Sequence, residues 1–117
     1  MDARFDKGTI NGVSYTNALY LHPLQYASGP ERRVEIDAGR SRKRFLGDLG
    51  IPDTEASTSA YKVDISLDGA APIYSTELKF GETKKIDLDI TNVLRIKILV
   101  SSISGYAYLA IGSPRLT

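Results

Sequence analysis

The 117-residue chain contains no cysteine, so it has no disulfide, no thiol nucleophile and no cysteine-based metal site. It also contains no tryptophan and a single histidine, His22, which is the one imidazole that could act as a general base. No Gly-x-Ser-x-Gly sequence accompanies it, so the nucleophile motif of the common serine hydrolases is missing. We therefore predict that the chain is not an enzyme and has no catalytic residues.

An excess of charge of one sign is also lacking. Fifteen basic and fourteen acidic residues leave a net charge of +1, which gives no overall field to attract nucleic acid or an anionic membrane. No apolar run approaches the roughly 20 residues of a membrane-spanning helix, and residues 1–10 lack the hydrophobic segment of a signal peptide. We expect neither nucleic-acid binding nor membrane insertion.

Apolar and polar residues alternate along much of the chain. The pattern recurs in segments 33–38, 61–68, 85–90 and 94–100, each bounded by glycine, proline or asparagine, whereas no helical period persists. A period of two places apolar side chains on one face of a strand. About eight such strands predict an all-β fold, an antiparallel β-sandwich of the jelly-roll type.

The length fits one hydrophobic core, so we expect a single domain over residues 1–117. Because the last apolar segment ends close to Thr117, we expect this domain to be excised from a larger protein. Residues 33–53 read as strand, turn and strand, a hairpin in the core, with Gly47 and Gly50 marking close backbone approach or a bulge. Residues 101–105 read as a loop.

Hairpin turns are predicted at two dipeptides that accept positive φ. Asn11-Gly12 lies between two short edge strands, and Asp68-Gly69 follows the strongest alternating segment.

Five segments, taken in order, carry a family resemblance. They are INGVSYTNALYLHP, VEIDAGRSRKRFLGDLGIPD, YKVDISLDGAAPIYST, DLDITNVLRIKILVS and IGSPRL. The positions that match the family pattern are Tyr15, His22, Arg44, Phe45, Asp68, Gly69, Tyr74, Ser75, 89–91 and 114–116. In this order they resemble the NPCBM family of carbohydrate-binding modules over nearly the whole chain.

The resemblance implies a galactose-binding-like β-sandwich whose loops at one end bind sugars. It implies a lectin-like, non-catalytic module that targets a parent protein to a glycan, a polysaccharide or a cell surface, and thus an extracellular or cell-surface location. One departure concerns residues 107–111, which read Ala-Tyr-Leu-Ala-Ile where the family has Asp-His-Ala-Asp-Trp. The alternative is therefore a protein-interaction or structural β-sandwich that has lost the sugar site.

A sugar site needs an aromatic face and a few fixed polar groups, and without tryptophan the tyrosines must supply the face. The ligand-binding candidates are Tyr20, His22, Tyr26, Tyr106, Tyr108 and Arg115. The family resemblance carries over His22, whereas the tyrosines are chosen for their chemistry and their position near predicted loops. In the alternative interpretation these tyrosines are rim residues with a solvated hydroxyl, and His22 is a hydrogen-bonded structural residue.

Basic residues cluster around the predicted turn at 39–44. They are Arg40, Arg42, Lys43 and Arg44, with Arg32 and Arg33 upstream. Guanidinium groups suit phosphates or an acidic polysaccharide, but we favour the interpretation of a solvated turn offset by nearby carboxylates. Arg44 is also a candidate to pair with a carboxylate inside the sandwich.

Carboxylates near the predicted loops raise the question of a metal. The candidates for a structural calcium are Asp48, Asp53 and Glu55, or Asp64 and Asp68. Calcium takes six to eight oxygen ligands, and the spacing matches no EF-hand loop, so we predict no cofactor and keep calcium only as an alternative.

Overall fold

The computed structural model describes residues 2–22, 31–55, 57–104 and 108–117, and within them the chain is built from strands without a helix. Nine strands are present where the sequence predicted about eight, and the all-β prediction is confirmed. Their bounds are β1 Asp2–Ile10, β2 Val13–His22, β3 Glu31–Asp37, β4 Arg44–Gly50, β5 Ala60–Leu67, β6 Tyr74–Lys79, β7 Thr83–Asp89, β8 Arg95–Ser104 and β9 Leu109–Leu116. None of the described residues lies in a helix that could cross a membrane.

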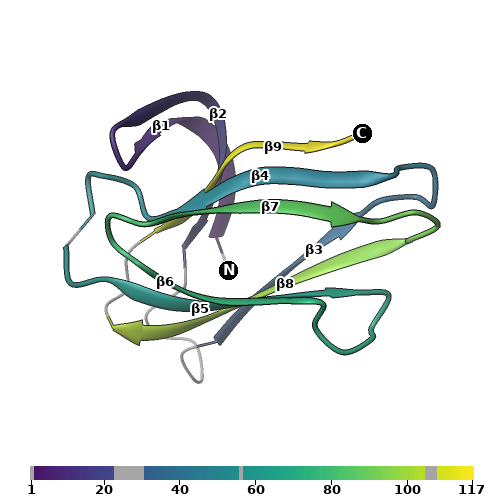
Figure 1. Cartoon of the computed structure of the whole chain (residues 1–117). Helices are drawn as coiled ribbons and strands as arrows, with labels where there is room; N and C mark the ends of the chain where they lie inside the picture. Colours follow the sequence, from purple (N-terminus) through teal and green to yellow (C-terminus); the bar gives the residue numbers. More distant parts are fainter. Residues whose placement is uncertain (1, 23–30, 56, 105–107) are drawn as a thin grey trace.

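Two antiparallel sheets face each other (Figure 1). The five-stranded sheet has the order β1-β2-β9-β4-β7, and the four-stranded sheet has the order β3-β8-β5-β6. The turns after β3, β5 and β7 lie at the right-hand end of the sandwich in Figure 1, and residues 51–55 and 57–59 lie at the opposite end. The predicted β-sandwich is therefore present.

The apolar side chains of the alternating segments are buried between the two sheets. On β5, Tyr61, Val63 and Ile65 are fully buried, and Lys62 on the other face is exposed. Phe45 and Leu49 of β4 meet them from the five-stranded sheet. Burying each of these large apolar side chains stabilises the fold by about 1.5–3 kcal/mol, so this layer is the main source of stability.

The segment 33–53 does not form the predicted core hairpin. β3 pairs with β8, whereas β4 pairs with β7 and β9, so the two strands belong to different sheets. The connection between them is held at both ends: the Ala38 amide donates to the carbonyl of Leu94, and the Lys43 amide donates to the carbonyl of Thr117. An alternating pattern fixes which face of a strand is buried, but not which neighbour it pairs with.

Both predicted hairpin turns are confirmed. Asn11 and Gly12 have φ values of 48° and 80°, and Asp68 and Gly69 have 51° and 75°, as a type I′ turn requires. The loop predicted at 101–105 is wrong in its first part, because β8 continues to Ser104.

The turn end of the β1–β2 hairpin folds over the outer face of β4 and β9 in its own five-stranded sheet, where two glycines allow close approach. A Cβ on Gly50 would collide with Ile10 Cγ2, and one on Gly112 would lie 2.6 Å from the Tyr15 ring. The pairing of β4 with β9 shifts register between Leu46 and Asp48, which pair with Arg115 and Gly112, so the extra residue of this irregularity lies on β9, opposite Gly47. Of the two alternatives predicted for Gly47 and Gly50, close backbone approach is confirmed at both, whereas the irregularity lies on the partner strand.

We predict that Gly112→Ala lowers the free energy of unfolding by about 1–3 kcal/mol, because the added methyl group overpacks the contact with Tyr15. Urea denaturation followed by circular dichroism measures the change. In a Tyr15→Ala background the same substitution is expected to cost much less. An equal cost in both backgrounds would show that the ring contact is not the cause.

Candidate functional site

The predicted ligand-binding residues divide into those that the structure describes and those that it does not. Tyr26 and Tyr106 lie outside the described residues, and so does the side chain of His22, which is the last residue of β2. The described side chains are those of Tyr20, Tyr108 and Arg115.

Tyr20 and Tyr108 come together. Tyr20 is on β2 and Tyr108 immediately precedes β9, and the antiparallel pairing of Leu21 with Leu109 brings the end of one strand beside the start of the other. The two rings meet edge to face, with centroids 5.8 Å apart and planes at 88°. This geometry favours an aromatic pair. The same pairing places His22 at this end of the sandwich.

Tyr20 has a structural role in this pair. Its side chain is only 9% exposed, and its hydroxyl donates a hydrogen bond to the carbonyl of Lys7 at 3.0 Å. The ring packs so closely over Gly8 that a Cβ there would collide with the hydroxyl. Little of its aromatic face is therefore open to a sugar ring.

Tyr108 is more accessible and lies beside a carboxylate. It is half-buried, and its amide donates a hydrogen bond of 3.0 Å to Glu55 Oε1. Glu55 belongs to the connection between β4 and β5, and the sequence pointed to it only as a calcium ligand. Glu55 is thereby fixed at the backbone of an aromatic residue, and sugar sites combine aromatic residues with carboxylates, which accept hydrogen bonds from hydroxyls.

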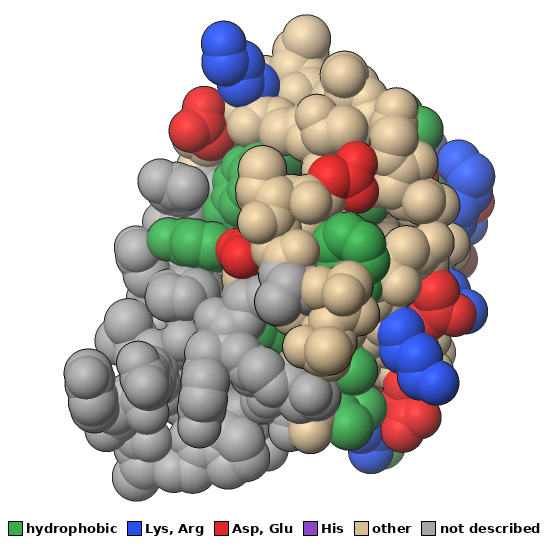
Figure 2. Space-filling view, turned by 90° about the vertical axis from the view of Figure 1, so that its left-hand side faces the viewer, with side chains coloured by type: hydrophobic (Ala, Val, Ile, Leu, Met, Phe, Trp, Pro, Cys, Tyr) green, Lys and Arg blue, Asp and Glu red, His purple; other side chains and the backbone are tan. Residues whose placement is uncertain are grey.

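The end of the molecule that carries these residues is seen in Figure 2, in which apolar side chains lie among single acidic side chains, with basic side chains near the margins. Such a mixture of apolar and hydrogen-bonding groups is chemically suited to a sugar, which has both apolar ring faces and hydroxyls.

Arg115 does not join the tyrosines. It lies near the far end of β9, about 20 Å from Tyr108 along an extended strand. Its guanidinium donates a hydrogen bond to the carbonyl of Ser113 at 2.8 Å. Two candidates are thus brought together by the fold, and Arg115 is separate from them.

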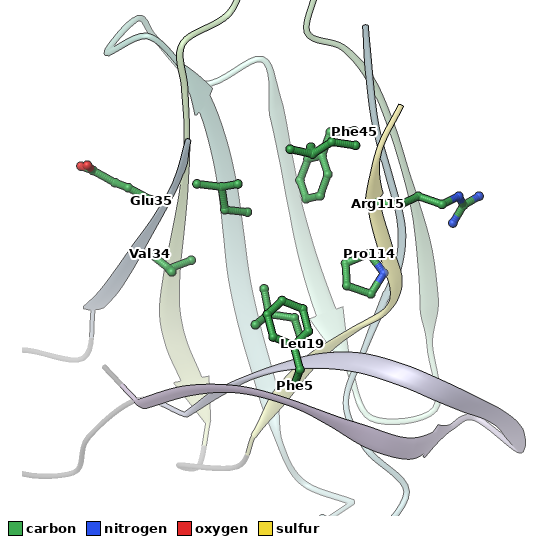
Figure 3. Close-up of a pocket in the computed structure, with 9 residues that line it drawn as sticks. Phe5, Leu19, Val34, Glu35, Phe45, Pro114 and Arg115 are labelled. Carbon is green, nitrogen blue, oxygen red and sulfur yellow. The ribbon is translucent and has the colours of Figure 1, made fainter. Parts of the chain in front are cut away.

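An apolar cleft of about 420 Å³ opens near Arg115, between the edges of the two sheets (Figure 3). Its walls include Phe5 and Leu19 from the β1–β2 hairpin and Val34 from β3. Phe5 is 66% exposed. Glu35 and Arg115 point away from the cleft on opposite sides, so its interior is apolar.

A tyrosine–carboxylate pair lies on the outer face of the five-stranded sheet. The Tyr15 hydroxyl donates a hydrogen bond of 2.9 Å to Asp48, which also accepts from Lys85 at 3.4 Å. Burial, and then the hydrogen bond and the charge of Asp48, raise the pKa of Tyr15 to about 12. Burial, and then the charge of Glu55, raise the pKa of Tyr61 in the core. Neither phenol is therefore an anion or a nucleophile at neutral pH.

The carboxylates proposed as calcium ligands mostly serve the backbone. Asp53 accepts hydrogen bonds from the amides of Asn11 and Gly12, at 2.7 and 2.8 Å. Asp68 accepts from the amides of Leu94 and Arg95. In the part of the chain that the structure describes, no group of three or more histidine, aspartate or glutamate side chains is placed to hold a metal.

The basic cluster is divided by the fold. Arg44 pairs with Asp87 at 2.6 Å, but the two side chains are 43% and 59% exposed, so the predicted pairing inside the sandwich is wrong. Arg40 turns the other way and donates to the carbonyl of Asn92 at 3.1 Å.

Comparison with protein families shows that the model of the NPCBM/NEW2 domain matches residues 3–110. Comparison with curated proteins gives no match.

Among solved structures, the chain is similar to a CBM51 module from Clostridium perfringens GH95 in complex with methyl-galactose. The identity is 16%, the TM-score is 0.69, and the similarity covers 99% of this chain and 81% of that one. It is also similar to the structure of CBM51-2 in complex with GlcNAc and INT domains from C. perfringens ZmpB, with 14% identity, a TM-score of 0.74 and coverage of 98% and 27%.

A third similar structure contains the M60 catalytic domain with the CBM51-1 and CBM51-2 domains of C. perfringens ZmpB. The identity is 17% and the TM-score is 0.70, and this chain is covered to 99% but spans only 13% of that one. These likenesses confirm the galactose-binding-like fold.

We predict that Tyr20→Phe lowers the free energy of unfolding by about 1 kcal/mol, because the carbonyl of Lys7 loses its buried donor. Chemical denaturation measures the loss. Tyr74→Phe is the matched control, because its hydroxyl makes a longer bond of 3.4 Å to a carbonyl, and it is expected to cost less. Equal losses would contradict the role given to Tyr20.

A second prediction concerns alkaline pH. Because folding raises the pKa of Tyr15 from 10.0 to about 12, its contribution to stability is complete below pH 10 and is lost as the pH rises through 12. Denaturation curves across this range are expected to show falling stability, with a shallower fall in Tyr15→Phe. An unchanged slope in this variant would exclude Tyr15 as a source of the dependence.

Proposed function

The chain belongs to the NPCBM/NEW2 domain family, and from this membership we propose that it is a non-catalytic carbohydrate-binding module that attaches a parent protein to glycans. The fold supports this function, because the chain shares it with CBM51 modules whose structures hold methyl-galactose or GlcNAc. A neutral hexose of the galactose or N-acetylglucosamine type is therefore the first ligand to test.

The observation that carries the proposal is the meeting of Tyr108, Tyr20 and Glu55 at one end of the sandwich. Tyr20 supports the ring of Tyr108 from the side, and Glu55 holds its backbone amide. In this arrangement Tyr108 offers an aromatic edge or face to the apolar side of a sugar, and Glu55 accepts from a sugar hydroxyl. Tyr108 would thereby supply the aromatic surface in a chain that has no tryptophan.

The absence of catalysis is part of the proposal. The sequence holds one histidine and no nucleophile motif, and the raised pKa values of Tyr15 and Tyr61 keep both phenols protonated. A binding module acts by recruiting a catalytic domain to a surface, and an extracellular or cell-surface location follows from that role.

We predict that methyl-galactose or GlcNAc binds the module and that Tyr108→Ala weakens binding about tenfold or more, because the aromatic contact is lost. Isothermal titration calorimetry, repeated with calcium and with a chelator, measures the affinity. Tyr108→Phe keeps the ring and is expected to bind nearly as well as the parent chain.

Arg115→Ala is the control at the far end of β9 and is expected to leave sugar affinity unchanged. Circular dichroism of each variant separates loss of binding from loss of folding. If the folded parent chain binds none of a panel of neutral glycans, the proposal is wrong.

The apolar cleft in Figure 3 favours a second candidate function, a protein-interaction domain. Its exposed Phe5 and its apolar walls suit a neighbouring domain of a longer chain, because the similar ZmpB modules are parts of much longer chains. Phe5→Ser is expected to weaken docking of such a domain in sedimentation experiments and to leave sugar binding unchanged.

A further inference from the structure

A second hollow lies near the opposite end of the sandwich from Tyr108, on the outer face of the four-stranded sheet. It measures about 490 Å³ and is bordered by the turns after β3, β5 and β7, at the right-hand end of Figure 1. Its charged lining consists of Arg33, Arg40, Arg95, Lys97, Glu35 and Asp68. Four positive and two negative groups give it a local excess of positive charge, although the chain as a whole is nearly neutral.

The two acidic side chains only partly neutralise the hollow. The carboxylate of Asp68 accepts hydrogen bonds from the backbone amides of Leu94 and Arg95, at 3.0 and 2.9 Å. Glu35 lies 3.7 Å from Arg95, and the two side chains are 47% and 62% exposed, so solvent weakens this pair. Among the ion pairs of the described residues, none involves Arg33, Arg40 or Lys97.

The positions of the basic groups are set by the fold. Lys97 of β8 lies opposite Glu35 of β3, and Arg33 lies two residues from Glu35 on the same face of its strand. Arg40 is held at the border by its bond to the carbonyl of Asn92. Its backbone has a φ of 63°, a conformation that a residue other than glycine rarely adopts. Strands and turns distant in sequence thus direct cationic groups to one place.

We propose that this hollow binds an oxyanion, a sulfate ester or a uronate carboxylate, of an acidic glycan. Guanidinium groups match the paired oxygens of such anions and form charge-assisted hydrogen bonds with them. Leu94 and the backbone of Gly69 complete the lining, which leaves room for the apolar face of a sugar ring beside the anion. That the anion is carried on a sugar rests on the proposed function, whereas the anion site itself depends only on the hollow.

The test uses the full chain and three sugars: galactose 6-sulfate, galacturonic acid and methyl-galactose. Amide shifts in ¹H–¹⁵N spectra report the two ends separately, with Gly69, Leu94 and Arg95 at the hollow and Tyr108 at the other end. Both acidic sugars, or the one whose anion fits, are expected to shift the hollow amides. Methyl-galactose is expected to leave the shifts of these amides unchanged. Added NaCl is expected to lower the affinity for the acidic sugars, because salt screens the charges.

Variants test the assignment to named groups. The double substitution Arg33→Gln and Lys97→Gln is expected to lower the affinity for the acidic sugar about tenfold or more. Lys62→Gln combined with Lys79→Gln makes the same change in net charge on exposed positions outside the hollow, and is expected to change affinity less than about twofold. Glu35→Gln removes the competing carboxylate and is expected to strengthen binding.

The proposal is overturned if neither acidic sugar shifts the hollow amides, or if the control pair weakens binding as much as the Arg33 and Lys97 pair. Inorganic sulfate that binds as tightly as galactose 6-sulfate would overturn the assignment to a sugar. The experiment tests the two sites separately. If methyl-galactose shifts the Tyr108 amide and no acidic sugar shifts the hollow amides, the proposed function is supported and the anion site is rejected. If an acidic sugar shifts the Gly69 amide and no sugar shifts the Tyr108 amide, the anion site is supported and the sugar site at Tyr108 is rejected.

Discussion

The antiparallel pairing of β2 with β9 is the constraint on which the candidate site depends, and close backbone approach at Gly50 and Gly112 holds the hairpin that contains β2. The space left by the two missing side chains is filled by Ile10 and Tyr15 of the first hairpin, whose turn end is thereby fixed on the outer face of β4 and β9. That hairpin carries Tyr20 to the edge of Tyr108. Larger side chains at these glycines would displace the turn end of the hairpin, whereas the pairing that sets Tyr20 beside Tyr108 lies in residues 18–21 and 109–112.

Local rules accounted for the elements of the fold. Alternation located β5 because apolar side chains at every second position are buried together, and Asn11-Gly12 and Asp68-Gly69 located turns because their backbone tolerates positive φ. Strand pairing was not accessible in the same way. β3 and β4 look like a hairpin in the sequence, but β3 pairs with β8 and β4 pairs with β7 and β9, so the chain changes sheets between them.

The site could be predicted only in part, because chemistry identifies suitable side chains but not their surroundings. Tyr20 and Tyr108 are the same residue type near the same predicted end, yet one is buried with its hydroxyl satisfied and the other is half-buried. Glu55 carried no signal for its bond to the amide of Tyr108, 53 residues away. The basic cluster likewise looked continuous, and the fold directs Arg44 to Asp87 and Arg40 to another surface.

The hydrogen bonds that Asp53 makes to the first turn affect the entropy of ligand binding. Its carboxylate ties the turn at Asn11 and Gly12 to the connection that also carries Glu55, two residues further on. The hairpin behind Tyr20 and the segment beside Tyr108 are therefore joined before any ligand arrives. Because these two segments are already connected, binding of a sugar orders less of the chain and loses less conformational entropy. A larger part of the favourable contact energy then contributes to the affinity.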